Sequence, residues 1–111
     1  MLDGYHLLTL THRNAPLETI GKMVLQDHAS PLLNLLKERF QWEEMMYLAT
    51  CNRVAILFFK HGPVSKNIEN EVVGIIRPDL PADEQDIIAS QMRLLHGADA
   101  IRHWLEVAAS M

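Results

Sequence analysis

The sequence has little that would build a covalent framework or carry the chain out of the cytoplasm. It contains one cysteine, Cys51, in 111 residues, so it can form neither an internal disulfide nor a cysteine-based metal site. No apolar run approaches the roughly 20 residues that span a bilayer, and the N-terminal MLDGYHLL lacks the basic flank and apolar stretch of a signal peptide. We therefore expect a cytoplasmic chain with no membrane partner.

The sequence also lacks an excess of positive charge and a glycine-rich phosphate loop. The formal net charge is −4, which argues against a domain whose main task is to grip phosphate backbones. Arg13 and Lys22, or Lys37 and Arg39, can still form a local basic patch. The five glycines do not form the G-x-G-x-x-G fingerprint of a dinucleotide site. No histidine pair has metal-ligand spacing beside a carboxylate, so we expect no bound metal.

What is present is the composition of an ordinary globular domain, with 49% apolar and 22% charged residues. A chain of 111 residues is enough for one core, so we treat residues 1–111 as a single domain. Periodicity and turn signals predict an order of elements. The elements are a strand at 5–12, helices from Pro16 and from about Ser30, strands at 44–49 and 54–60, helices at 65–76 and 82–90, a strand at 92–95 and a helix at 98–109.

This order predicts an α+β domain. Strand, helix, strand, strand, helix, strand is the split β-α-β arrangement of ferredoxin-like sandwiches, in which an antiparallel sheet has helices on one face. One C-terminal helix is added here. Ser30 is the expected N-cap of the second helical segment, with Pro31 at its first position. A fold of this kind does not by itself specify an activity.

The polar segment TCNR lies between the two central strand-like runs and contains Cys51. A free cysteine commonly behaves as a small hydrophobic residue and is buried. A reactive thiol instead needs partial exposure and nearby donors or positive charge. Thr50, Asn52 and Arg53 flank Cys51 and provide such groups, so the local sequence leaves both interpretations open.

Of the six histidines, His12 lies at the end of the first predicted strand and His103 lies inside the last predicted helix. A histidine among apolar helix neighbours is more often a half-buried structural residue than a catalyst. A Cys-His pair forms through the tertiary fold, and the spacing of residues in the sequence does not show it.

A resemblance to a known family rests on three segments, LTHRNAP, LATCNR and GADAIRHWLEVAAS. Their order and spacing resemble the N-terminal domain of glutamyl-tRNA reductases. That family has a His-Lys-Thr-Ala-Pro-like segment, then Ser-Thr-Cys-Asn-Arg, then an Ala-Val-His-Leu-Phe-x-Val-Ala-Ser-Gly helix. The chain departs from the family at Ala49, where Ser is usual, and at Asn14, where Thr is common. Ala55 and Leu57 replace an acidic and aromatic pattern, and Ile20 and Gly21 replace an Arg-Glu pair of the first helix.

The resemblance implies a reaction. Cys51 would attack the aminoacyl ester of glutamyl-tRNA to give an enzyme thioester, and His103 would assist the acyl transfer. NADPH would reduce the thioester to glutamate-1-semialdehyde, the precursor of 5-aminolevulinate and tetrapyrroles. Arg53 is suited to pairing the substrate carboxylate. The implied substrate-binding residues are Thr50, Asn52, Arg53 and His12.

The resemblance also implies partners and further domains. The NADPH-binding and helical dimerisation domains of the family have no counterpart in these 111 residues, so we expect that this piece does not reduce substrate alone. The implied partners are glutamyl-tRNA, a second copy in a full-length homodimer and a downstream aminomutase. The alternative is a non-catalytic ferredoxin-like binding or regulatory module that uses a Met- and Trp-rich surface.

Overall fold

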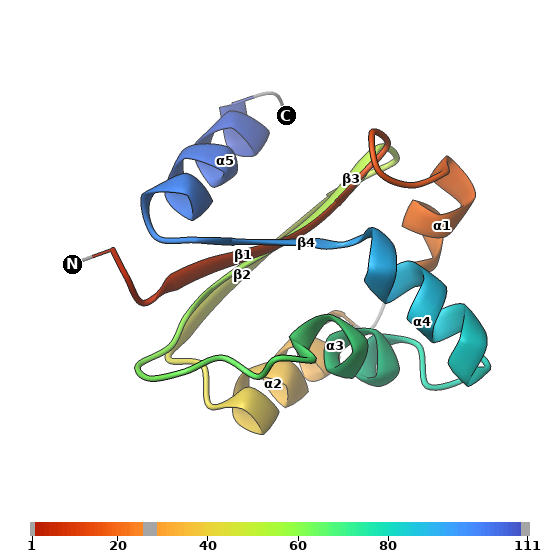
Figure 1. Ribbon diagram of the computed structural model, residues 1–111, viewed down its shortest axis with the longest axis horizontal. Coiled ribbons are helices and arrows are strands. Elements are labelled where there is room, and N and C mark those ends of the chain that lie inside the picture. Colours follow the sequence, from red (N-terminus) through yellow and green to blue (C-terminus); the bar gives the residue numbers. More distant parts are fainter. Residues whose placement is uncertain (1, 26–28, 110–111) are drawn as a thin grey trace.

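The computed structural model describes residues 2–25 and 29–109, which form an antiparallel sheet of four strands with helices on both faces (Figure 1). The strand order is β2-β3-β1-β4. The strands are β1 (Tyr5–Thr11), β2 (Glu44–Thr50), β3 (Arg53–Phe59) and β4 (Arg93–His96). The helices are α1 (Leu17–Lys22), α2 (Ala29–Phe40), α3 (Ile68–Ile76), α4 (Ala82–Gln91) and α5 (Ala98–Ala109). None of these helices is both long and apolar enough to cross a membrane.

The α+β class, the antiparallel sheet and the order of elements are confirmed, and two details of the helices are corrected. The helix predicted from Ser65 begins at Ile68, because the Ser65 hydroxyl accepts the Asn67 N–H at 3.2 Å and holds a turn before the helix. Ser30 is not an N-cap, since α2 already includes Ala29. Pro31 is tolerated there because the first N–H groups of a helix have no intrahelical partner.

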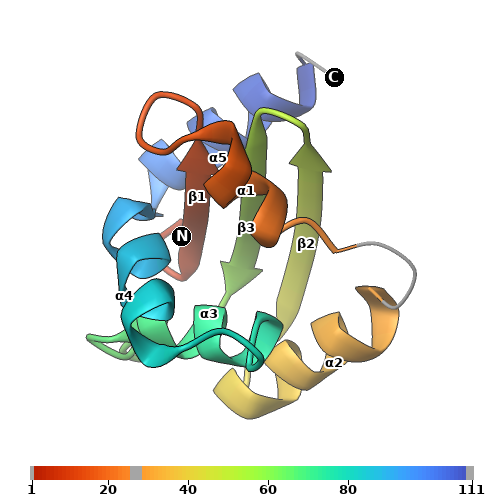
Figure 2. The ribbon, with the colours of Figure 1, turned by 90° about the vertical axis from the view of Figure 1, so that its right-hand side faces the viewer.

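The first face of the sheet is covered by α1, α2, α3 and α4, and we call it the four-helix face. Figure 2 shows these helices in front of the sheet and α5 behind it. Leu8, Leu10 and Ile56 point to this face and are fully buried, in one continuous apolar cluster with residues of all four helices. Trp42 stacks on Phe58 with ring centroids 4.0 Å apart. This face therefore forms the main core of the domain.

The opposite face is covered by α5 alone, and we call it the α5 face. Gly97 has φ +66°, a conformation that glycine adopts without steric cost, and it turns the chain from β4 into α5. Its N–H donates to the Tyr5 carbonyl at 2.8 Å. Trp104 packs on this face in a smaller cluster with Leu7 and Ala55. Because alternate residues of a strand point to opposite faces, the odd-numbered residues of β1 face α5.

Candidate active site

Cys51 and Asn52 form the two-residue turn of the β2–β3 hairpin, since Thr50 pairs with Arg53 across the two strands. The Asn52 N–H donates to Thr50 Oγ1 at 3.2 Å. The Asn52 carbonyl accepts the backbone N–H of His12 at 3.0 Å. The turn is therefore fastened both to its own strand and to the chain that follows β1, which holds the backbone of Cys51 in place.

The side chain of Cys51 is exposed. Its Sγ lies 3.5 Å from Asn52 Oδ1, to which the thiol can donate. The interpretation of Cys51 as a buried, core-filling residue is therefore wrong. An exposed thiol on a fixed turn is accessible to a substrate, as a nucleophile must be.

A polar cleft of about 150 Å³ lies between α5 and the end of the sheet that carries this turn. We call it the arginine cleft because Arg13, Arg53 and Arg93 all line it. Arg53 is two residues from Cys51 and is half-buried, whereas Arg13 and Arg93 are exposed. The further polar lining comes from Thr9, Thr11, Asn14, His103 and Glu106.

The three arginines of the cleft have no charge partner within the described residues. The ion pairs formed by side chains in 2–25 and 29–109 involve other residues, and Glu106 is the single acid that lines the cleft there. Guanidinium groups are always charged and pair carboxylates and phosphates in a bidentate manner. The charge of the arginine cleft therefore favours an anionic ligand.

His103 lies on the α5 wall of the cleft. Its Nδ1 is buried and has no hydrogen-bond partner in the part of the chain that the structure describes. Buried polar atoms are normally hydrogen-bonded, so an unpaired one calls for an explanation. A bound ligand that reaches this nitrogen would provide the missing partner.

The structure brings some of the predicted site residues together and separates others. Arg53 and His103 line the same cleft, and Cys51 lies on the adjoining turn. Thr50 and Asn52 hold that turn together by the hydrogen bond given above. His12 is exposed and contacts the turn through its backbone.

Sequence reasoning missed most of the remaining lining of the cleft. Thr9 and Thr11 alternate on the central strand, and such a polar pair in an otherwise apolar strand was a usable signal for a polar site on one face. Glu106 lies three residues after His103 and therefore on the same side of the helix. Arg93 gave no local signal, since only the pairing of β4 with β1 brings it to the cleft, where it lies opposite Thr9.

Arg13 and Lys22 make up one of the two local basic patches that the sequence allows, but the structure groups Arg13 with other residues instead. Lys22 lies 4.0 Å from Glu84, whereas Arg13 shares the cleft with Arg53 and Arg93. Of the departures from the family, Asn14 lines the cleft, whereas Ala49, Ala55 and Leu57 fall outside it. Ala49 packs against the core of the four-helix face, and Ala55 and Leu57 pack in the apolar cluster beneath α5. These three residues leave the lining of the cleft unchanged.

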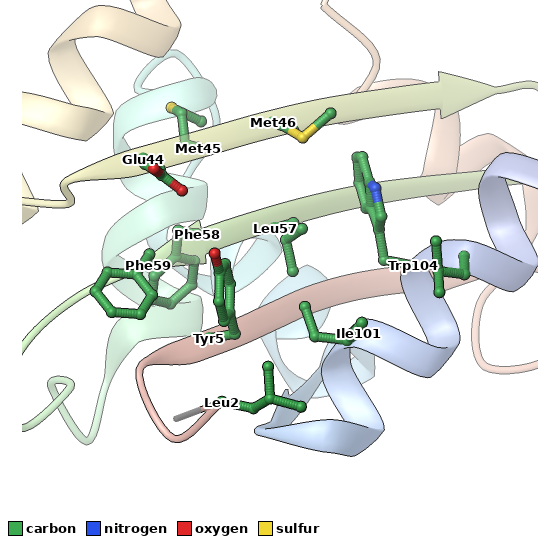
Figure 3. A pocket seen from close by; sticks show the side chains of 11 residues that line it. Leu2, Tyr5, Glu44, Met45, Met46, Leu57, Phe58, Phe59, Ile101 and Trp104 are labelled. Atoms are coloured by element: carbon green, nitrogen blue, oxygen red, sulfur yellow. The ribbon is translucent and has the colours of Figure 1, made fainter.

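A second hollow, of about 330 Å³, lies at the other end of the α5 face (Figure 3). We call it the apolar groove. Ile101 and Trp104 extend from α5 toward the strands, where Leu57 and Met46 lie. Glu44 is the one charged side chain of the described residues that line it. The described part of the chain also contains no cluster of three His, Cys, Asp or Glu side chains that could hold a metal ion.

An exposed thiol on a fixed turn, a cationic cleft and an unpaired imidazole define a class of protein. It is an α+β domain with an accessible thiol beside a cleft whose charge suits an anionic ligand. The family model described as "Glutamyl-tRNAGlu reductase, N-terminal domain" matches residues 8–111. The chain belongs to this family.

Individual relatives agree with the family assignment. The chain is 29% identical over 110 residues to "Glutamyl-tRNA reductase" of Syntrophobacter fumaroxidans, covering 95% of this chain and 23% of the relative. It is 28% identical over 109 residues to the protein of the same name from Sulfolobus acidocaldarius, covering 98% and 23%. The chain therefore spans less than a quarter of the length of these curated relatives.

A solved structure supports the fold. The structure titled "Glutamyl-tRNA Reductase from Methanopyrus kandleri" matches with a TM-score of 0.59 and 19% sequence identity. The match covers 91% of this chain and 21% of that chain. At this level of identity the likeness shows the fold of the domain.

Proposed function

We propose that this domain takes the glutamyl group of glutamyl-tRNA onto Cys51 as a thioester, as the N-terminal catalytic domain of an NADPH-dependent glutamyl-tRNA reductase. The observation that carries the proposal is the exposed thiol on a turn that adjoins a cleft with three arginines. The shared name of the relatives supports the substrate. The strand order β2-β3-β1-β4, with α1 to α4 on one face and the added α5 on the other, supports the ferredoxin-like assignment of the single domain 1–111.

In the proposed step, the Cys51 thiolate attacks the ester carbonyl carbon. A C–S bond forms, the C–O bond to the terminal ribose breaks, and the ribose oxygen leaves with a proton. Arg53 pairs the side-chain carboxylate of the glutamyl group. His103 lies near the reacting carbonyl and gives the proton with which the ribose oxygen leaves. Thr50, Asn52 and His12 complete the substrate-binding set at the turn.

NADPH would supply the hydride that converts the thioester to glutamate-1-semialdehyde and returns the thiolate. The residues of this chain do not fit the cofactor, because the described strands are all antiparallel and the five glycines form no phosphate-binding loop. We therefore assign NADPH to a part of the longer protein outside this chain. The same proposal includes a homodimer of the full-length protein and an aminomutase that takes the semialdehyde as its substrate. It places the reaction in cytoplasmic tetrapyrrole synthesis.

Alkylation and acylation of Cys51 test the proposal. Brief iodoacetamide treatment at pH 7 followed by mass spectrometry should modify the folded domain once. Incubation with radiolabelled glutamyl-tRNA should leave label on the protein that hydroxylamine releases, as a thioester requires. Cys51→Ser should abolish the label. Arg102→Gln is the matched control, since Arg102 is exposed on α5 and is paired with Asp99. A thiol that reacts only after denaturation, or label that persists in Cys51→Ser, would refute the proposal.

The apolar groove favours the second candidate function, a non-catalytic binding or regulatory module. Met46 and Leu105, which line the groove, are 55% and 61% exposed, more than apolar side chains of a core would be. The two candidates differ in one result. A folded domain whose Cys51 reacts with iodoacetamide but takes no glutamyl label from glutamyl-tRNA would favour the binding module.

A further inference from the structure

The arginine cleft carries more positive charge than a glutamyl group needs. One carboxylate is satisfied by one guanidinium in a bidentate pair, and Arg53 alone provides that pair. The glutamyl group also brings an α-ammonium cation, for which Glu106 is the one acid in the described lining. These two pairings leave Arg13 and Arg93 without an anion.

Of the two unassigned arginines, Arg93 lies in a different part of the cleft from Arg53, and Arg13 follows β1 at the end of the sheet that carries the Cys51 turn. Arg53 is on β3 opposite Thr11, whereas Arg93 is on β4 opposite Thr9, on the other side of β1. Strands are about 4.8 Å apart and residues about 3.4 Å apart along a strand, so the Cα atoms of Arg53 and Arg93 are about 12 Å apart. The side chains of Arg53 and Arg93 therefore extend from strands on opposite sides of β1, and their guanidinium groups can bind separate anions.

Exposure orders these arginines from the inside of the cleft to its mouth. Arg53 is half-buried and adjoins the Cys51 turn, while Arg13 and Arg93 are exposed. An acyl group that reacts at Cys51 and pairs its side-chain carboxylate with Arg53 occupies the half-buried part of the cleft. Arg13 and Arg93 then face whatever part of the substrate remains outside. In an ester between glutamate and an RNA 3′ end, that part is the terminal ribose and its phosphodiester.

We propose that Arg13 and Arg93 form a phosphate subsite at the mouth of the arginine cleft, which holds the terminal phosphodiester of the RNA while its glutamyl ester meets Cys51. This subsite rests on the proposed function for the identity of its occupant. Phosphate contacts position a nucleic acid and carry no sequence information. A two-arginine subsite is also compatible with the net charge of −4, because it requires a local patch and not a basic surface.

Binding of small probes to the 111-residue protein tests the subsite. Adenosine 5′-monophosphate imitates the terminal nucleotide, adenosine lacks the phosphate, and glutamate carries the carboxylate. Titrations followed by NMR should show that the monophosphate binds more tightly than adenosine. Arg93→Gln and Arg13→Gln should each weaken monophosphate binding about tenfold, the effect of losing one charge-assisted hydrogen bond. Arg93→Lys should recover part of the loss.

The controls separate the subsite from the carboxylate site. Arg93→Gln and Arg13→Gln should leave glutamate binding unchanged, whereas Arg53→Gln should weaken it. Arg102→Gln, an arginine outside the cleft lining, should change neither. With a CCA trinucleotide, the loss of one phosphate contact in Arg93→Gln should reduce the slope of log K against log salt by about 0.7.

Each of three results would overturn the subsite. The first is a monophosphate that binds no better than adenosine. The second is a monophosphate affinity that Arg93→Gln and Arg13→Gln leave unchanged, and the third is an equal loss of that affinity in Arg102→Gln. Acylation kinetics with glutamyl-tRNA distinguish this failure from failure of the proposed function. If the subsite is correct, Arg93→Gln raises the KM for acylation and leaves the rate at saturation unchanged. If Cys51 takes no label while monophosphate binding still depends on Arg93, the subsite stands and the proposed function fails.

Discussion

The two faces of the sheet use the same strands but are built differently. The four-helix face is one continuous apolar cluster. The α5 face has a small apolar cluster under the helix, with the arginine cleft at one end and the apolar groove at the other. A helix of 12 residues is about 18 Å long and about 10 Å wide, so it covers only about two strands of a four-stranded sheet. Stability is therefore concentrated on one face, and the hollows that can bind ligands are on the other.

The largest expected effect contrasts a leucine on each face. Leu8→Ala on the four-helix face should lower the free energy of unfolding by about 3–4 kcal/mol, because Leu8 is fully buried in a closed cluster. Leu57→Ala should cost about 2 kcal/mol, because Leu57 borders the open groove, where neighbours and water can fill the space. Urea unfolding measures both variants. An equal or larger loss for Leu57→Ala would contradict the contrast between the faces.

The next prediction concerns the edge strand β2. Its side chains pack against the core on the four-helix face and line the apolar groove on the α5 face. On the four-helix face, the Tyr47 hydroxyl accepts the Leu25 N–H at 2.9 Å and donates to the Met23 carbonyl at 3.1 Å. Burial raises the pKa of Tyr47 above its usual value, so the phenol stays protonated and keeps donating. Tyr47→Phe should lower the free energy of unfolding by about 1–2 kcal/mol, since both backbone groups lose their partner.

The matched control for Tyr47→Phe is Tyr5→Phe. Tyr5 lies on the α5 face and lines the apolar groove. Its replacement should change the free energy of unfolding by less than about 0.5 kcal/mol, as is usual away from buried polar contacts. If the two variants lose the same stability, the hydrogen bonds of Tyr47 do not close this edge of the sheet.

A third, smaller effect has the opposite sign. His103→Leu should raise the free energy of unfolding by about 1 kcal/mol, because it removes a buried nitrogen that has no partner among the described residues. The same variant should slow acylation of Cys51 by glutamyl-tRNA. Thermal unfolding and acylation rates, measured on one preparation, check both parts. Loss of stability in His103→Leu would show that His103 serves the fold and not the cleft.

The smallest effect concerns His6, on the four-helix face beside β4. Burial lowers the pKa of His6 below 6.5, the Gly4 carbonyl partly opposes this, and His96 lowers it further. The unfolded chain therefore takes up the proton first as the pH falls. The stability that neutral His6 contributes is complete above about pH 6.5 and decreases as the pH falls from there toward the lowered pKa. His6→Gln should flatten this part of the pH profile in urea unfolding.

The control for His6→Gln is His61→Gln, at a histidine whose side chain is 75% exposed. This replacement removes a histidine from the exposed surface, so it shows whether the flattening is specific to the buried position of His6. A parent profile that is already flat in this range would contradict the role given to His6. An equal flattening in both variants would contradict it as well.

The sequence predicted the elements well where the signal was local. Alternation in the first strand and β-branched and aromatic content in the third predicted strands that the structure has at Tyr5–Thr11 and Arg53–Phe59. The helix starts were less accurate. At Ser65 a side-chain hydrogen bond to the backbone holds a turn in place of the first turn of helix, and this competition between cap and helix is not visible in apolar spacing.

The site was predicted in part for the same reason. TCNR marked Cys51 and Arg53 because the four residues are adjacent in the sequence. Arg13 and Arg93 are 80 residues apart in the sequence and meet at one cleft because β4 pairs with β1. Pairing between distant strands depends on the packing of the whole sheet, so no local pattern announces it.

The amino-acid sequence by itself determined the α+β class, the order of elements and the family, because these depend on periodicity and on motifs a few residues long. Only the tertiary structure decided that Cys51 is exposed, that α5 lies alone on its face, and that three arginines share one cleft. These features depend on contacts between residues far apart in the chain. Gly97 links the two levels, because its local backbone conformation connects β4 to α5 and directs α5 onto its face of the sheet.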